Sequence, residues 1–160
     1  DQRTEGLIEG LKRARVIQAA FFLNPGFLAN PDGAEGEAHI RAYVAAGHVI
    51  ANHSFSHPHL NVTPAEEYLV DIDRAEAWLK GGEGRRPWFR FPFLDEGGPD
   101  KARRDAIRAG LAARGLQNGY VTIDGSDWNI EVFPPIRDLR AILAANGQPA
   151  VSAGKAIEAR

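Results

Sequence analysis

Three of the chain's five histidines lie within seven residues, in the stretch HSFSHPHL at 53–60. His53 and His57 stand four positions apart, a spacing that places two side chains on one face of a helix. Pro58 follows His57, and a residue before proline is pushed out of helical geometry. We therefore expect a loop with a turn, in which two neutral imidazoles could bind Zn²⁺ or another divalent first-row ion. The alternative is a pair of surface loop histidines.

Two neighbouring histidines are less suited to such a site. His48 opens a predicted strand at its far end, and His59 follows the proline. We expect both to be structural or to face solvent.

The stretch RFPF at 90–93 places a charged residue inside an apolar strand. A buried arginine needs a carboxylate partner, and its planar fork would hold an acid in place. The alternative for Arg90 is a side chain that reaches solvent along its apolar stem.

The stretch DGSDW at 124–128 contains two acids near the end of another predicted strand. Asp124 and Asp127 could ligate a metal, orient a histidine or pair with Arg90. The alternative is turn chemistry, since Asp-Gly is a common start of a turn.

Helix-like and strand-like segments alternate along the chain, with apolar spacing that distinguishes the two. The clearest helix has Thr63 at its N-cap, Pro64 at its first position and Glu66 at the capping-box position. We predict helices at 4–14, 35–46, 63–82, 99–115 and 136–147, and strands at 16–23, 48–52, 88–91, 119–124 and 149–152.

This alternation predicts an α/β fold with a mainly parallel sheet. In such folds the chemistry gathers at the carboxyl ends of the strands. His53, Arg90 and Asp124 each stand at or just after a strand end, so we expect one shared edge to carry the site.

Length and composition fit one domain over residues 1–160. The net charge of -2 favours neither nucleic acid nor an anionic membrane as a partner. No apolar run is long enough to span a bilayer. The absence of cysteine excludes disulfides and thiolate zinc sites. Methionine is also absent, so we expect a processed or excised piece of a longer protein.

NHSFSHP, RFPF and DGSDW, in this order and each at a strand end, resemble the polysaccharide deacetylases, the family of the NodB homology domain. The resemblance runs from about residue 5 to residue 131. It implies an irregular or partial (β/α) barrel and metal-dependent removal of acetyl groups from an N-acetylated polysaccharide or oligosaccharide. It also implies a divalent cofactor, zinc being the expected ion, and a periplasmic or secreted location.

The resemblance also implies roles for single residues. His53 and His57 match the two metal-binding histidines. Arg90 matches the arginine that orients the catalytic base, and Phe93 the aromatic residue whose backbone N–H faces the oxyanion. Asp127 matches the acid that tunes a catalytic histidine. Trp128 matches a wall of the acetate pocket.

Two parts of the family's pattern have no clear counterpart. The family carries an Asp-Asp pair at the end of its first strand, as base and third metal ligand, and here the candidates are Asp1 or a residue outside the chain. The family's catalytic histidine comes last, whereas no histidine follows His59. We therefore expect impaired turnover. The competing interpretations are a glycan-binding domain without turnover and a structural α/β domain with incidental histidines.

Overall fold

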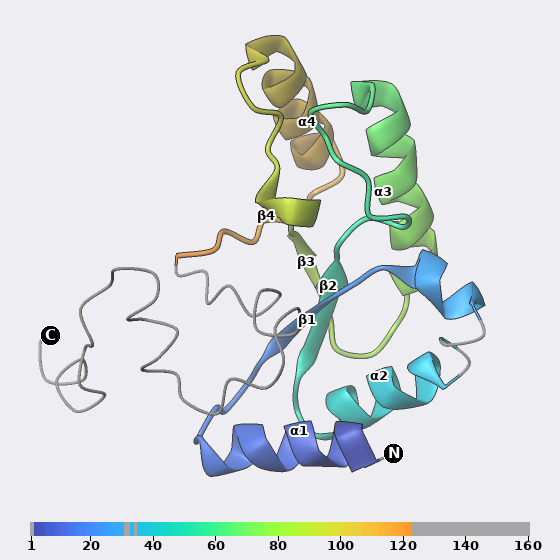
Figure 1. Ribbon diagram of the computed structural model, residues 1–160, viewed down its shortest axis with the longest axis vertical. Coiled ribbons are helices and arrows are strands. Elements are labelled where there is room, and N and C mark those ends of the chain that lie inside the picture. The colour runs from blue at the N-terminus through green and yellow to red at the C-terminus, as the bar shows by residue number, and fades with distance from the viewer. Residues whose placement is uncertain (1, 31–32, 34, 123–160) are drawn as a thin grey trace, which may run out of the picture. The chain divides into compact units, whose positions relative to one another are not determined.

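A computed structural model describes residues 2–30, 33 and 35–122 of the chain. Strands and helices alternate, as Figure 1 shows. The helices are α1 (Gln2–Arg13), α2 (Gly36–Ala45), α3 (Ala65–Leu79) and α4 (Lys101–Ala113). The strands are β1 (Ala20–Leu23), β2 (Val49–Asn52), β3 (Arg85–Phe89) and β4 (Gln117–Asn118). Two short 3-10 helices, η1 (Pro25–Ala29) and η3 (Pro92–Leu94), follow β1 and β3.

The four strands form one parallel sheet in the order β1-β2-β3-β4. The predicted α/β fold with a mainly parallel sheet is confirmed. Within the described part of the chain the sheet is open, so it is a partial barrel and not a closed one. All four residues of β2 are buried, as expected for a central strand of a parallel sheet.

The first strand is shorter than the predicted 16–23, because the preceding helix ends in a turn that uses these residues. Arg15 adopts a left-handed conformation with φ of 58°. The Val16 N–H then donates to the Leu11 carbonyl (2.9 Å), which is a helix-ending bond. Ile17 is 94% exposed. The apolar residues at 16 and 17 therefore belong to the turn that follows α1 and not to the sheet.

The third and fourth strands begin earlier than predicted. β3 starts at Arg85 and ends at Phe89, so Arg90 follows the strand and does not lie inside it. The Arg90 N–H still donates to the Asn52 carbonyl (3.0 Å) beyond an irregularity in the β2–β3 register. β4 is Gln117–Asn118, so the predicted strand at 119–124 is wrong for residues 119–122. The predictions for 136–147 and 149–152 lie outside the described residues.

Helix α3 begins at Ala65, two residues after the predicted cap. Pro64 occupies the N-cap position without a capping side chain. The Thr63 hydroxyl instead donates a hydrogen bond to the His59 carbonyl (2.7 Å). This bond connects the start of the helix to the loop at residues 53–59, the histidine loop.

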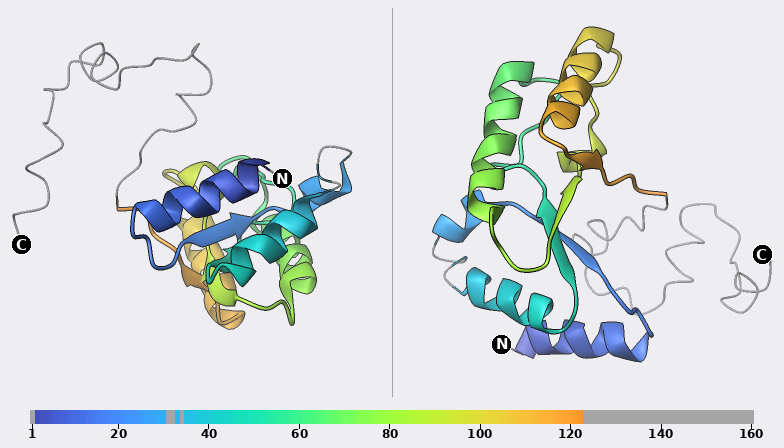
Figure 2. Two further views of the ribbon diagram at one scale, coloured as in Figure 1. Left: turned by 90° about the horizontal axis from the view of Figure 1, so that it is seen from below. Right: turned by 180° about the vertical axis from the view of Figure 1, so that it is seen from behind.

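The core lies between the sheet and the helices α3 and α4, which pack side by side (Figure 2). α4 is capped by Asp100, whose side chain accepts a hydrogen bond from the Arg103 N–H (3.0 Å). The buried core residues are Leu60, Tyr68, Ile72, Phe89, Phe91, Ile107, Leu111 and Leu116. This core supports the carboxyl ends of β2 and β3, where the candidate site lies.

In the described residues, no helix combines the length and apolar character that a bilayer crossing requires. Residue contacts group Asp1–Tyr120 into one compact unit and Val121–Arg160 into a second, which lies almost wholly outside the description. The assignment of 1–160 to a single domain stays a prediction.

Candidate metal site

His53 and His57 face each other in the loop that follows β2. Their Nε2 atoms are 3.3 Å apart and their rings meet edge to face, with centroids 4.9 Å apart. His57 has φ of 61°, outside helical geometry. The predicted loop is confirmed, and the two imidazoles approach each other in this loop without helical geometry.

The separation of the two Nε2 atoms fits a shared metal ion. With Zn–N bonds of about 2.0–2.1 Å, two ligands on a tetrahedral ion lie about 3.3–3.4 Å apart. The two nitrogens could also share one proton in a hydrogen bond. The donor set and its spacing suit zinc or another first-row divalent ion.

The surroundings of His53 set its protonation state and its tautomer. Its Nδ1 lies 2.8 Å from the Arg90 carbonyl oxygen, an acceptor that holds the proton on Nδ1 and leaves the Nε2 lone pair free. Burial lowers the pKa of His53 to about 4, with a smaller contribution from nearby His57, although the bond to the carbonyl opposes the shift. Burial also lowers the pKa of His57. Both imidazoles are therefore neutral at pH 7, the form that binds metals.

One side of the histidine loop is held by the start of η1. The Asn24 side-chain amide donates to the carbonyls of His53 and Ser54, the latter at 3.2 Å. The Gly26 N–H donates to the Phe55 carbonyl (3.0 Å). A β-carbon at Gly26 would lie 2.5 Å from that oxygen, closer than real contacts allow, so this position requires glycine.

We expect the Gly26→Ala substitution to lower the free energy of unfolding by about 1–3 kcal/mol, because the added methyl group displaces the histidine loop. Urea denaturation measures the change. Gly6→Ala is the control, since a β-carbon there meets nothing within 4 Å in the exposed face of α1. That control is expected to be neutral or slightly stabilising. A Gly26→Ala protein as stable as the unsubstituted chain would contradict the close packing of Gly26 on Phe55.

Arg90 lies beside the histidines on the edge of the sheet. Its Nε donates to the Gly119 carbonyl (3.0 Å), and its guanidinium carbon lies 4.0 Å from the centre of the Phe22 ring. Burial lowers the pKa of Arg90. Among the described residues, Arg90 has no carboxylate partner of the kind that we predicted. Its guanidinium instead contacts the face of the Phe22 ring and donates to the Gly119 carbonyl.

The partly exposed ring of Phe93 lies next to His57, one of the two converging histidines. It adopts φ of 56° in η3 and is 55% exposed. His59 stacks on its ring, with centroids 3.5 Å apart and planes 9° from parallel, and His57 meets it edge to face at 4.5 Å. His59 also lies 3.7 Å from Asp95. His59, which was predicted to be structural or to face solvent, packs on Phe93 with a half-exposed side chain and lies beside the candidate site.

His48 lies at the opposite end of β2, away from the pair. It is buried, and its Nδ1 accepts a hydrogen bond from the Ala19 N–H (3.2 Å). The prediction of a structural role for His48 is confirmed.

Asp1, Asp124, Asp127 and Trp128 lie outside the described residues. Within the described ranges, no group of three or more His, Cys, Asp or Glu side chains could hold a metal ion. The structure therefore brings two candidate ligands together, and the metal site with its third ligand stays a prediction.

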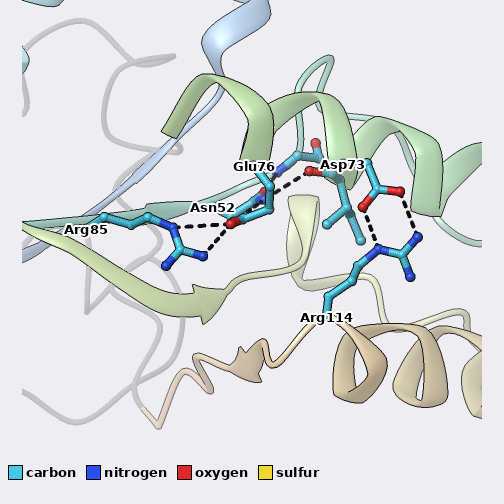
Figure 3. A network of polar contacts seen from close by, with 7 residues as sticks. Asn52, Asp73, Glu76, Arg85 and Arg114 are labelled. Atoms are coloured by element: carbon cyan, nitrogen blue, oxygen red, sulfur yellow. Dashed lines mark hydrogen bonds and ion pairs between the residues drawn. The ribbon is translucent and has the colours of Figure 1, made fainter. Parts of the chain in front are cut away.

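Hydrogen bonds to α3 hold the end of β2, and these contacts were not predicted from the sequence. The Asn52 side-chain amide donates to the Ile72 carbonyl (3.1 Å) and to Glu76 (2.8 Å), which also pairs with Arg85 (Figure 3). The Asn52 side-chain oxygen accepts a hydrogen bond from the Ser54 N–H (2.7 Å). Asp71 lies one helical turn after Tyr68 on the same buried face. The position of Asp71 among the apolar positions of α3 could have indicated a buried polar contact.

Comparisons with known proteins show the family to which the chain is similar. The family model described as polysaccharide deacetylase matches residues 1–113 of the chain. A chitin deacetylase from Colletotrichum lindemuthianum is 29% identical over 92 residues, which are 57% of this chain and 37% of that protein.

Solved structures show the same fold. A family 4 carbohydrate esterase from Streptomyces lividans, in complex with acetate, is 30% identical with a TM-score of 0.61 over 81% of this chain and 61% of the other. The structure of the Colletotrichum lindemuthianum chitin deacetylase is 24% identical with a TM-score of 0.62, over 79% of this chain and 53% of the other. The chain thus spans less than two thirds of each of these relatives.

Proposed function

This chain belongs to the polysaccharide deacetylase family, and we propose that its histidine loop serves the hydrolysis of N-acetyl groups on a sugar polymer such as chitin or peptidoglycan. The proposal includes a divalent metal cofactor, with zinc as the expected ion. One observation carries it: the Nε2 atoms of His53 and His57 converge to 3.3 Å, the spacing of two ligands on one ion.

His53 and His57 would hold the metal through their Nε2 atoms. A bound divalent ion supplies Lewis-acid chemistry, which polarises an amide carbonyl and makes a water more acidic. The Arg90 carbonyl supports this binding, because it keeps the His53 proton on Nδ1.

Other residues would shape the place where the acetamide group reacts. The Phe93 ring centre lies 4.5 Å from that of His57, and the backbone N–H of Phe93 is the proposed donor to an oxyanion. Arg90 is the proposed partner of the base, and Asp127 and Trp128 are the proposed tuning acid and acetate-pocket wall. These roles come from the family resemblance.

We further propose that turnover by this chain is impaired. No histidine follows His59 to act as the general acid, and Asp1 is the only residue of the chain proposed as the third ligand. The second candidate function is therefore glycan binding without turnover, in which the exposed ring of Phe93 offers a stacking surface for a sugar.

Acetate release from an N-acetylated chitooligosaccharide, with zinc added, tests the proposal. We expect slow release that is lost in a His53→Ala/His57→Ala protein. Glycan binding measured on the same samples separates the two candidate functions, because binding without any acetate favours the second. Release that is unchanged in the double variant would contradict a role for the histidine loop, and release at an ordinary enzymatic rate would contradict the impairment.

A further inference from the structure

Asp71 of α3 contacts the histidine loop through its carboxylate. Its Oδ2 accepts hydrogen bonds from the backbone N–H groups of Phe55 (2.9 Å) and Ser56 (3.0 Å). Its Oδ1 accepts a third from the Ser56 hydroxyl (2.9 Å). Asp71 is 8% exposed, so the loop covers this carboxylate and shields it from water.

A cation completes the surroundings of this carboxylate. Arg74, one turn further along α3, places a guanidinium nitrogen 3.7 Å from Asp71. The same guanidinium lies over the Phe55 ring, 4.0 Å from its centre. Phe55 is therefore held both through its backbone, by Asp71, and through its ring, by Arg74.

Every backbone N–H from residue 53 to residue 57 donates a hydrogen bond. His53 donates to Leu23 and Ser54 to the Asn52 side chain. His57 donates to the Ser54 hydroxyl (3.1 Å). Asp71 accepts the two in the middle of the run, so it fixes the segment that separates the two metal-ligand candidates.

The loop needs such fixing because its conformation is unfavourable on its own. Ser54 and His57 have φ of 66° and 61°, in the left-handed region that L-residues rarely adopt. Without the carboxylate, the N–H groups of Phe55 and Ser56 would lose their acceptor, and the loop would relax to find others. His53 and His57 flank this segment, so their Nε2 atoms would no longer converge.

We propose that Asp71 is a positioning residue for the metal site: it holds the loop between His53 and His57 so that their Nε2 atoms face a single ion. This inference rests on the proposed function, since it assumes that the pair binds a metal. It adds a residue of α3, outside the three motifs of the sequence, to those on which metal affinity depends.

The Asp71→Asn substitution tests this inference, with Asp73→Asn as its matched control. Asp73 lies on the same helix and pairs with Arg114 (2.6 and 2.7 Å), as Figure 3 shows. Both substitutions remove one negative charge from α3 and keep the size of the side chain. In Asp71→Asn an amide nitrogen replaces one acceptor, so a loop donor loses its partner.

Zinc titration by calorimetry on folded samples is the first readout. We expect Asp71→Asn to weaken zinc binding by about 10–100-fold, the usual loss for an outer-shell partner, and Asp73→Asn to leave it unchanged. Ser56→Ala removes only one of the three bonds and is expected to cause a smaller loss, which keeps the test available if Asp71→Asn fails to fold. A purely structural role of Asp71 would lower stability without changing the affinity of the folded protein.

Amide hydrogen exchange of Phe55 and Ser56, measured without metal, is the second readout. We expect faster exchange of both amides in Asp71→Asn and not in Asp73→Asn. Unchanged zinc affinity in Asp71→Asn, or an equal loss in Asp73→Asn, would overturn this inference alone. An unsubstituted chain that binds no zinc would overturn the metal site and this inference together, so the two failures are distinguishable.

Discussion

The His53→Ala substitution is expected to weaken zinc binding by more than about 100-fold, because loss of an outer-shell partner alone costs about 10–100-fold and His53 is a proposed direct ligand. His53 is also the better fixed of the two imidazoles, through its bond to the Arg90 carbonyl (2.8 Å). His57→Ala should have a comparable effect, since one histidine alone makes no chelate. Isothermal titration with zinc measures both losses.

His59→Ala is the control for this prediction. His59 stacks on Phe93 and lies in the same loop region, but its ring is not part of the converging pair. We expect zinc affinity within about threefold of the unsubstituted chain, since surface changes away from ligands have small effects. Equal losses for His59→Ala and His53→Ala would contradict the assignment of His53 and His57 as the metal ligands.

The Phe89→Ala substitution is expected to lower the free energy of unfolding by about 3–5 kcal/mol, the usual cost of removing a buried phenylalanine ring. Phe89 is fully buried at the end of β3. Its ring packs against Tyr68 and Phe91, with centroids 6.3 and 5.0 Å away. The cavity would open at the end of β3, directly before Arg90, so we expect the histidine loop to lose stability as well.

Urea denaturation followed by circular dichroism checks this prediction. Val62→Ala is the control, because Val62 is 77% exposed and its loss should change stability by less than about 0.5 kcal/mol. A Phe89→Ala protein that unfolds at the same urea concentration as Val62→Ala would show that the core between the sheet and helices α3 and α4 is not what stabilises the fold.

The order of helices and strands could be predicted because it depends on local apolar spacing. The run at 48–52 has the apolar residues Val49, Ile50 and Ala51 at its centre, and it contains the buried central strand β2. The residues at which strands begin and end were less predictable, because they depend on hydrogen bonds to the adjacent strand. Arg90 seemed to lie inside a strand by its apolar flanks, yet β3 ends at Phe89 after an irregularity in its register with β2.

The sequence left the choice between a metal-binding pair and two surface histidines open, but the loop that contains His53 and His57 was predictable from the proline after His57. The supporting contacts were not, since they join residues far apart in the chain. Asp71 meets the loop 15 and 16 positions earlier. His59 and Phe93, 34 positions apart, stack only because the loops after β2 and β3 meet at one edge of the sheet. Local patterns indicate candidate ligands, whereas tertiary packing decides what holds them.

The metal content of the chain tests the central claim most directly. Native mass spectrometry after addition of zinc and removal of the excess counts the bound ions. We predict one zinc ion per chain, bound by His53 and His57, and none in a His53→Ala/His57→Ala protein that remains folded by circular dichroism. An unsubstituted chain without zinc, or a double variant that keeps the ion, would contradict the account.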